Sequence, residues 1–437
     1  MARKPNILFI MTDQQRADHV GFMGNSVVQT PHLDGLAASG CVFENAWVSN
    51  PVCMPNRATI LTGRMPTAHG VIFNDRSLDW YANTFVRQLR ADGYRTALLG
   101  KSHLQHGMSR NAVVDFRGEG AVLSSEPAGW DQYEDFERYA DGLPEDPNDF
   151  YGFEKIALSI DHGARVTGHH LHWALERGAR REDLLTPHDH TAPGDKRSEE
   201  WWQIYEAPYE EQFHSTRFVT ERTQQFIQEC SEQDEPWMAL CSYPDPHHPV
   251  CPPGPWFDRH NPDDMPLPGS RHDSLEHAPA HLRIFQGVHP ANQRDWVAPC
   301  GYGNDRLLSQ AIAATYGMIE MVDDGVGQIL AQLEGLGVRD NTIIVFTSDH
   351  GDMMGDHGLF LKGFMHYRGT LQVPLVIDAP GLPALRTQGL SSSIDIAPTL
   401  LELCSLAGYD GIQGNSLAPM LSDSTARVRD HVLIEDD

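Results

Sequence analysis

The chain has 437 residues and a formal net charge of −27, from 33 Lys plus Arg against 60 Asp plus Glu. Hydrophobic residues make up 40% of the chain and charged residues 21%, which is typical of a globular protein with a large core and excludes a disordered chain. The acidic balance argues against nucleic acid and anionic lipid as partners, and an anionic substrate would need a local pocket of positive charge.

The seven cysteines are widely spaced, and no Cys-x-x-Cys pair occurs. This pattern favours neither a disulfide framework nor a zinc ribbon. The first segment holds only five consecutive apolar residues, 7–11, which is short for a secretory signal, and no apolar run has the length of a membrane span. We therefore expect a cytoplasmic protein with reduced thiols and no membrane contact.

Apolar runs with little polar alternation predict buried parallel strands at residues 7–11, 96–99, 237–241, 342–347 and 373–377. Thr84 is a candidate cap for a helix that ends near Gly93. Apolar residues from Ile312 to Leu333 recur at spacings of three and four, which predicts a long amphipathic helix ending near Gly335. Strands alternating with helices predict an α/β fold with a large, mostly parallel sheet sandwiched by helices.

The predicted domain organisation is one catalytic α/β domain over residues 1–428, followed at 429–437 by the start of a small C-terminal subdomain, which we expect to be truncated within a strand. Residues from about 105 to 212 are rich in Asp, Glu, Gly, His and Pro and show weak periodicity, so we interpret them as one long insertion over the sheet. Their histidines are irregularly spaced, which favours a polar surface over a second metal site; they are His169, His170, His172, His188 and His190.

Polar residues that can carry chemistry directly follow four of the predicted strands. In an open α/β sheet, ligands bind beyond the carboxyl ends of the strands, so these residues should meet in one place. They are Asp13 and Gln14, Lys101 and His103, Asp245, His247 and His248, and Asp349 and His350.

Four of these residues, Asp13, Gln14, Asp349 and His350, form a candidate metal site. Carboxylate and amide oxygens suit calcium, magnesium or manganese, and the imidazole shifts the preference somewhat towards manganese. The alternative for His350 is a hydrogen bond outside the ligand set. Without a cation, the clustered carboxylates would repel one another and take up protons.

A second constellation is Cys53-Met-Pro-Asn-Arg57. Pro55 suits the first turn of a helix, which places Cys53 at a helix N-terminus, where the free N–H groups favour an anion. A lone cysteine is usually a small buried hydrophobe. Here the neighbouring proline and the positive charge of Arg57 favour an anion site.

Together with Thr62-Gly-Arg64 downstream, this Cys-x-Pro-x-Arg segment resembles the signature of type I sulfatases in the alkaline-phosphatase-like superfamily. The resemblance extends in order over almost the whole chain and leaves the central insertion unmatched. The further matching segments are residues 6–13, 30–34, 100–103, 246–249, 348–352, 357–362, 373–375 and 395–399.

The resemblance implies that Cys53 is oxidised by a maturation enzyme to formylglycine, whose hydrate cleaves a small or saccharide sulfate ester while bound to the metal, with calcium the first expectation. It also implies that Arg57 orients the formylglycine and that Lys101 and Lys362 bind sulfate oxygens. His103 would act as a base near the diol, and His247 would protonate the leaving oxygen. The alternative is that the two lysines are solvated surface charges and that the two histidines are ordinary loop residues.

One departure from the sulfatase pattern keeps another activity open. Many sulfatases have a second Asp where this chain has Gln14, and Gln14 with His350 resembles the related phosphonate monoester and phosphodiester hydrolases. Lys101 and His103 match the sulfatase branch and favour sulfate-ester hydrolysis. A silent relative that only binds anions is disfavoured, because every catalytic position is filled.

Overall fold

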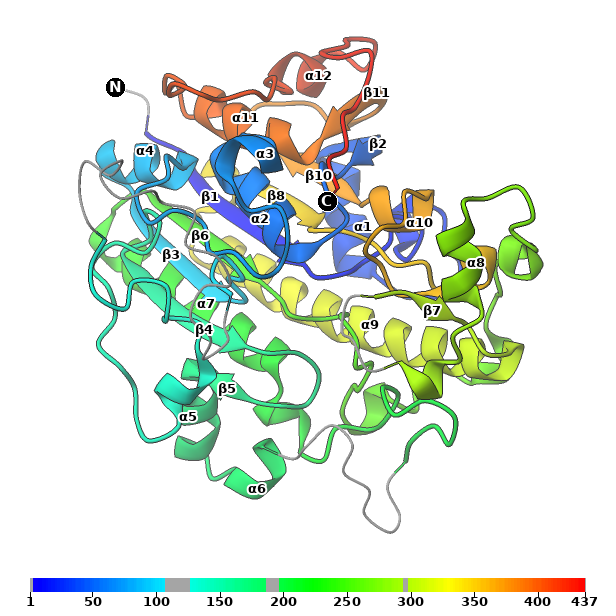
Figure 1. Cartoon of the computed structure of the whole chain (residues 1–437). Helices are drawn as coiled ribbons and strands as arrows, with labels where there is room; N and C mark the ends of the chain where they lie inside the picture. Colours follow the sequence, from blue (N-terminus) through cyan, green and yellow to red (C-terminus); the bar gives the residue numbers. More distant parts are fainter. Residues whose placement is uncertain (1–2, 107–125, 186–195, 294–297, 437) are drawn as a thin grey trace, which may run out of the picture.

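The computed structural model describes residues 3–106, 126–185, 196–293 and 298–436. Nine strands form one sheet in the order β11-β2-β10-β8-β1-β6-β3-β4-β5 (Figure 1). Their bounds are β1 Asn6–Thr12, β2 Cys41–Trp47, β3 Arg95–Gly100, β4 Lys155–Ile160, β5 Thr167–Gly168, β6 Trp237–Ser242, β8 Thr342–Ser348, β10 Leu375–Asp378 and β11 Leu385–Ser392. The short strands β7 Cys300–Gly301 and β9 Leu359–Phe360 form a separate antiparallel pair.

The central strands β8, β1, β6, β3 and β4 run parallel, so the prediction of a mostly parallel α/β sheet is confirmed. Strand β10 differs, because it pairs antiparallel with both β8 and β2. The expectation of a parallel strand at 373–377 is therefore wrong in direction and also in its start. Pro374 has no N–H to donate to a ladder, and an apolar run carries no information about strand direction.

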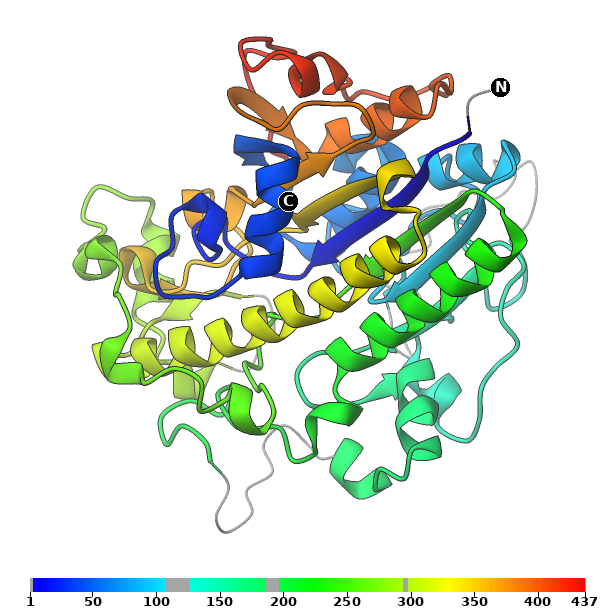
Figure 2. The same ribbon diagram turned by 180° about the vertical axis from the view of Figure 1, so that it is seen from behind.

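Helices cover both faces of the sheet. Side chains of β1 alternate between the two layers: Ile7, Phe9 and Met11 pack with α2, α4 and α11, whereas Leu8 and Ile10 pack with α1, α7 and α9 (Figures 1 and 2). The helix bounds are α1 Pro31–Ser39, α2 Cys53–Thr62, α3 Pro66–His69, α4 Phe85–Ala91, α5 His169–Glu176, α6 Arg181–Leu184, α7 Ser215–Gln233, α8 Ala280–Gln286, α9 Asp305–Gly335, α10 Arg368–Leu371, α11 Ile396–Leu403 and α12 Ala418–Ser422.

Three helices were predicted from the sequence, and all are present, including α2, which begins at Cys53 as expected. The Thr84 hydroxyl caps α4 by accepting a hydrogen bond from the Arg87 N–H at 3.2 Å. Helix α9 ends at Gly335 and spans 31 residues along one face of the sheet. Among the described residues, no helix is long and apolar enough to cross a membrane.

The interpretation of residues 105–212 as one irregular insertion over the sheet is wrong for the part that holds β4. This strand pairs in parallel with β3 and extends the sheet, and β5 pairs with it on the far side. Its apolar core is short and lies within a polar segment, which hides it from a search for hydrophobic runs. His188 and His190 lie outside the described residues, and the domain boundary near residue 428 stays a prediction.

The last described residues do not form the expected strand. Residues 431–436 have no regular secondary structure and instead lie against the chain that leads into α2. The Glu435 N–H donates to the Ser49 carbonyl at 2.9 Å, and the Asn50 side chain donates to the Glu435 carbonyl at 2.7 Å. These two contacts hold Glu435 against the loop that leads into α2.

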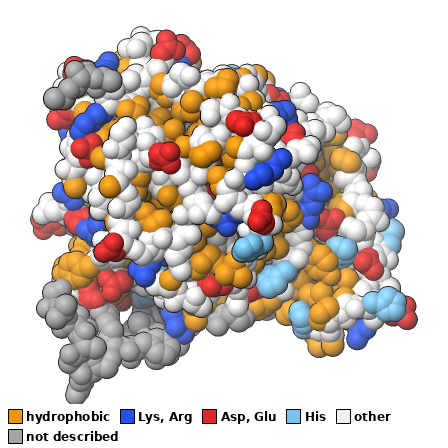
Figure 3. Space-filling view, turned by 90° about the horizontal axis from the view of Figure 1, so that it is seen from above, with side chains coloured by type: hydrophobic (Ala, Val, Ile, Leu, Met, Phe, Trp, Pro, Cys, Tyr) orange, Lys and Arg blue, Asp and Glu red, His pale blue; other side chains and the backbone are white. Residues whose placement is uncertain are grey.

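The surface seen from the C-terminal helices carries both signs of charge. In Figure 3, acidic and basic side chains are scattered among hydrophobic and uncharged ones. The described part of this face therefore offers no continuous stripe of positive charge of the kind that binds a nucleic-acid backbone.

Candidate active site

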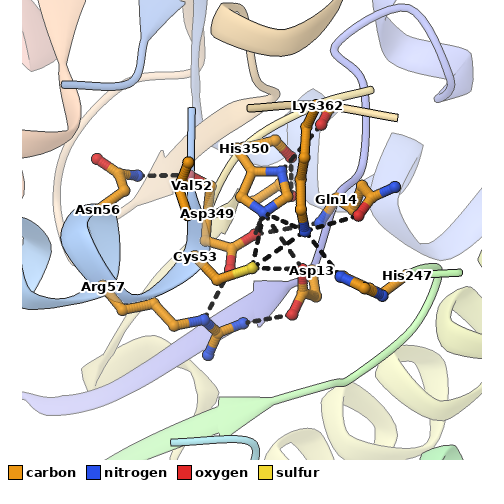
Figure 4. A network of polar contacts seen from close by, with 12 residues as sticks. Asp13, Gln14, Val52, Cys53, Asn56, Arg57, His247, Asp349, His350 and Lys362 are labelled. Atoms are coloured by element: carbon orange, nitrogen blue, oxygen red, sulfur yellow. Dashed lines mark hydrogen bonds and ion pairs between the residues drawn. The ribbon is translucent and has the colours of Figure 1, made fainter. Parts of the chain in front are cut away.

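The loops that follow β1, β8, β6 and β3 meet beside the N-terminus of α2 (Figure 4). These strands are neighbours in the sheet, so their carboxyl ends lie along one edge. The structure brings together all the residues that the sequence proposed for metal binding and catalysis, with His103 at the periphery. They are Asp13, Gln14, Cys53, Arg57, Lys101, His103, His247, Asp349, His350 and Lys362.

Cys53 is the first residue of α2 and is 1% exposed. Its Sγ lies 3.1 Å from His350 Nε2, 3.1 Å from Lys362 Nζ and 3.9 Å from Asp13 Oδ1. Burial and Asp13 raise the pKa of the thiol, but Lys362, Lys101 and His350 outweigh them and hold it well below its ordinary value. Cys53 is thus surrounded by functional groups, which distinguishes it from a cysteine that fills a hydrophobic core.

Arg57, one turn further along α2, connects the helix to the strand ends. Its Nε donates to Asp349 Oδ2 at 2.6 Å, and its Nη2 lies 3.4 Å from Asp13 Oδ2. Its Nη1 donates to the Lys101 carbonyl at 3.0 Å and to the Ser242 hydroxyl at 2.9 Å. The guanidinium is 1% exposed and has a partner on every nitrogen, so it fixes the position of both carboxylates.

The atoms best placed to hold a metal are Asp13 Oδ1, Asp349 Oδ1, His350 Nε2 and Cys53 Sγ. The four residues present ligand atoms within 4.8 Å of one another, and all four are buried. Arg57 takes the Oδ2 atom of each carboxylate, so the Oδ1 atoms face the cluster. His350 Nδ1 donates to the Gly351 carbonyl at 2.9 Å, which leaves the Nε2 lone pair directed at the same point.

The electrostatics of this cluster also favour a cation. Burial lowers the pKa of His350, but Asp349 and Cys53 together outweigh it, so the net pKa is raised and the surroundings attract positive charge. Burial raises the pKa of Asp13, but Lys101, Arg57 and Lys362 hold it well below its ordinary value. Buried carboxylates that stay ionised need positive charge nearby. The residues therefore fit a divalent metal ion.

Gln14 reaches the cluster through its amide oxygen. Its Nε2 lies 2.8 Å from His248 Nδ1 and donates to Asp352 Oδ2 at 2.5 Å, which orients Oε1 towards Lys362 Nζ at 2.8 Å. Lys362 Nζ also lies 3.1 Å from His350 Nε2. The Lys362 ammonium thus contacts Gln14 and His350, two residues that the sequence proposed as metal ligands. His248 and Asp352 orient the Gln14 amide.

Lys101 and two residues that the sequence interpretation missed form the other side of the site. Lys101 Nζ contacts both Asp13 Oδ2 and His162 Nε2. The buried Glu134 carboxylate accepts from the backbone N–H groups of residues 103–105, at 2.6, 2.9 and 3.0 Å. His103 has a φ of 55°, and its Nδ1 is buried and, among the described residues, without a partner.

His247 lies between the two lysines. Its Nδ1 donates to the His248 carbonyl, and its Nε2 accepts from Lys362 Nζ at 2.7 Å. Its ring stacks on His162 with centroids 3.8 Å apart and on His248 with centroids 4.1 Å apart. Burial, then His162 and Lys362, hold the pKa of His247 well below its ordinary value, so the ring is neutral before an anion enters.

Known proteins are similar to this chain over nearly its whole length. The family described as Sulfatase matches residues 5–406. An arylsulfatase of Clostridium perfringens is 30% identical over 98% of this chain and 81% of that protein. A choline-sulfatase of Rhizobium meliloti is 26% identical over 96% of this chain and 72% of its own length. The crystal structure of a phosphonate monoester hydrolase of Agrobacterium radiobacter superposes with a TM-score of 0.75, at 26% identity, over 97% of this chain and 78% of that chain.

Proposed function

The chain belongs to the sulfatase family, and from that premise we propose that it hydrolyses a sulfate ester to an alcohol and inorganic sulfate at Cys53. The observation that carries the proposal is the environment of this cysteine. Its thiol lies among Lys362, His350 and Asp13, with Lys101 and His247 close by, so positive and proton-carrying groups surround the proposed nucleophile. This environment suits the attack of an activated nucleophile on an anionic ester.

In the proposed reaction, Cys53 is first converted to formylglycine by a maturation enzyme, and its hydrate supplies the hydroxyl that attacks sulfur. Arg57 would orient this group, since the guanidinium already fixes the carboxylates beside it. A covalent sulfate intermediate divides one difficult displacement into two easier steps. His103, whose Nδ1 has no partner among the described residues, would serve as the base that assists release of sulfate.

Lys101 and Lys362 would bind the sulfate oxygens, and His247 would deliver a proton to the leaving oxygen. Lys362 donates to His247 Nε2, the atom that would carry this proton. Burial and the neighbouring positive charge keep the ring neutral, and a bound anion would act in the opposite direction by favouring the imidazolium. One well-placed donor in such a site lowers the barrier by about 3 kcal/mol.

Asp13, Asp349 and His350 would hold the metal, together with the Gln14 amide oxygen and the modified Cys53. The ion would supply positive charge that polarises the ester and lowers the pKa of the nucleophile. Oxygen donors and buried carboxylates favour calcium and also suit magnesium, whereas the imidazole shifts the preference somewhat towards manganese. Metal analysis of the purified protein, followed by chelation and re-addition of each ion, tests this assignment.

A second candidate activity is hydrolysis of a phosphonate monoester or phosphodiester with the same nucleophile. It is favoured by the similarity to the phosphonate monoester hydrolase structure and by the pair Gln14 and His350. Both substrate classes offer a tetrahedral monoanion to the same lysines. We place sulfate esters first because Lys101 and His103 match the sulfatase branch and because Lys101 contacts Asp13, a proposed metal ligand.

The test compares kcat/KM for 4-nitrophenyl sulfate and bis(4-nitrophenyl) phosphate, using protein produced with the maturation enzyme. We expect the sulfate ester to react at least about tenfold faster and Cys53→Ala to lose this activity. Cys404→Ala, at the end of α11, is the matched control and should keep it. Mass spectrometry of the peptide around residue 53 should find sulfur lost. An unmodified thiol in an active protein would contradict the proposed nucleophile.

The proposed substrate is a small or saccharide sulfate ester. Relatives of this chain are named for aryl, choline and N-acetylglucosamine 6-O-sulfate esters, so the family permits alcohols of very different size. The charge of −27 disfavours long polysulfated chains. Sulfate release from a panel of aryl, choline and sugar sulfates would identify the class of alcohol.

A further inference from the structure

We propose that His162 is a positioning residue that holds the Lys101 ammonium in place for the sulfate group, an inference that rests on the proposed function. His162 follows β4 at the outer side of the site and is 16% exposed at its side chain. Asp161, between the strand and His162, has a φ of 76°. This left-handed conformation turns the chain, and Asp is one of the residues that tolerate it.

The contact between His162 and Lys101 has a defined direction. A lysine ammonium carries only N–H donors, so His162 Nε2 must accept and Nδ1 must carry the ring proton. Burial and Lys101 hold the pKa of His162 well below its ordinary value, which agrees with a neutral ring. The second acceptor of Lys101 is Asp13 Oδ2. One neutral and one charged acceptor therefore fix an ammonium that sits on a flexible four-carbon stem.

The same arrangement occurs at the other lysine of the site. Lys362 Nζ donates to His247 Nε2 at 2.7 Å, as Lys101 Nζ donates to His162 Nε2. The two imidazole rings stack on each other, with centroids 3.8 Å apart and planes at 27°. Each ammonium is thus held by a ring, and the rings hold each other. This geometry sets the separation of the two lysine ammonium groups that would bind one sulfate.

A different use of the same residues is a second metal site. Asp13, His162 and His247 present ligand atoms within 4.8 Å of one another. However, the Lys101 ammonium already contacts Asp13 and His162, and the Lys362 ammonium contacts His247. Positive charge at this place comes from the protein itself, so we favour the positioning role and treat a second metal ion as an outcome of the test.

The test uses two substitutions that separate the acceptor from the ring. His162→Phe keeps a ring that can stack on His247 but removes the acceptor, whereas His162→Gln keeps an acceptor and removes the ring. A hydrogen bond to a charged group predicts a loss in kcat/KM for 4-nitrophenyl sulfate of about 10- to 100-fold in His162→Phe. His162→Gln should recover activity to within about threefold of the wild type. His172→Phe, on α5 in the same segment, is the matched control.

A double-mutant cycle with Lys101→Met identifies the residue through which His162 acts. If His162 serves Lys101, His162→Phe should change the rate less than about twofold once Lys101 is already replaced. An equal loss in both backgrounds would overturn the proposal, as would equal losses in the Phe and Gln variants. A second equivalent of bound metal that disappears in His162→Phe would assign the residues to a metal site instead.

Binding of inorganic sulfate, measured by calorimetry, makes the test independent of turnover. The Kd for sulfate should rise in His162→Phe and in Lys101→Met by similar factors, and the double variant should show no further rise. If the wild type cleaves neither ester probe, the proposed function fails, while the sulfate-binding cycle still decides the role of His162. If the esters are cleaved but sulfate binding is indifferent to His162, the positioning role fails alone.

Discussion

The proposed active site has two halves that are built in different ways. The central half, made of Asp13, Asp349, His350, Cys53 and Arg57, comes from the middle strands β1 and β8 and from the first turns of α2. The outer half, made of Lys101, His103, Glu134 and His162, lies around the ends of β3 and β4. In the central half, buried groups of opposite charge satisfy one another directly.

The outer half depends on residues that are neither proposed ligands nor proposed acid–base groups. Glu134 holds the backbone of residues 103–105, and His162 holds the Lys101 ammonium. On the proposed function, the central half would provide the nucleophile and hold the metal, whereas the outer half would position the lysine that binds sulfate and the base. Substitutions in the two halves should therefore impair the protein in different ways.

Chelation of the metal should have the largest effect on activity and a small effect on folding. We expect the rate to fall by about 10³-fold or more, because transition-state charge loses its main stabilising cation. The fold should survive, because Arg57 and Lys101 already pair with Asp13 and Asp349. Rates and thermal melts with and without a chelator, then with calcium, manganese or magnesium added back, check this. Unfolding on chelation would mean that Arg57 and Lys101 alone do not neutralise the buried carboxylates of the central half.

Replacing Arg57 should give the largest loss of stability. Arg57→Met leaves two buried carboxylates without their shared partner, which is expected to lower the free energy of unfolding by about 3–5 kcal/mol. Urea denaturation of the metal-free protein measures this.

The matched control is Arg386→Met, because Arg386 pairs with Glu44 at 2.9 Å but is 47% exposed at its side chain. Such a surface pair should contribute about 0–1 kcal/mol. Equal destabilisation by the two substitutions would contradict the view that the buried charges of the central half neutralise one another.

The difference between the halves also explains what could be predicted from sequence. Asp13, Lys101, His247 and Asp349 each follow a strand that is a clear apolar run, so the rule about carboxyl ends places them together. His162 obeys the same rule after β4, but that strand lies in a polar segment, so the sequence pattern assigns it to an insertion. A search for short apolar runs inside polar segments could have found it.

Glu134 left no comparable signal. Its carboxylate reaches a backbone about 30 residues away through tertiary contacts alone, and it follows no strand. The direction of β10 was likewise beyond local pattern, because antiparallel and buried parallel strands can share the same composition. The fold class and the nucleophile motif were accessible because they depend on hydrophobic period and on a short contiguous signature.

Glu134→Gln should have the smallest of these effects and is the sharpest test of the outer half. The carboxylate accepts three backbone N–H groups, and a glutamine would direct an NH₂ group at one of them. The loop that carries Lys101 and His103 would then shift, and we expect kcat to fall by about 10-fold, a loss of roughly 1.4 kcal/mol.

Because Glu134 touches neither the proposed metal ligands nor Cys53 in any described contact, metal content and formylglycine conversion should stay at wild-type levels in Glu134→Gln. Glu137→Gln, on the exposed surface of the same segment, is the control. A lower melting temperature with unchanged kcat would mean that Glu134 only stabilises the fold. A loss of kcat with intact metal and conversion would separate the two halves, because displaced Lys101 and His103 would slow the reaction while the central half stays complete.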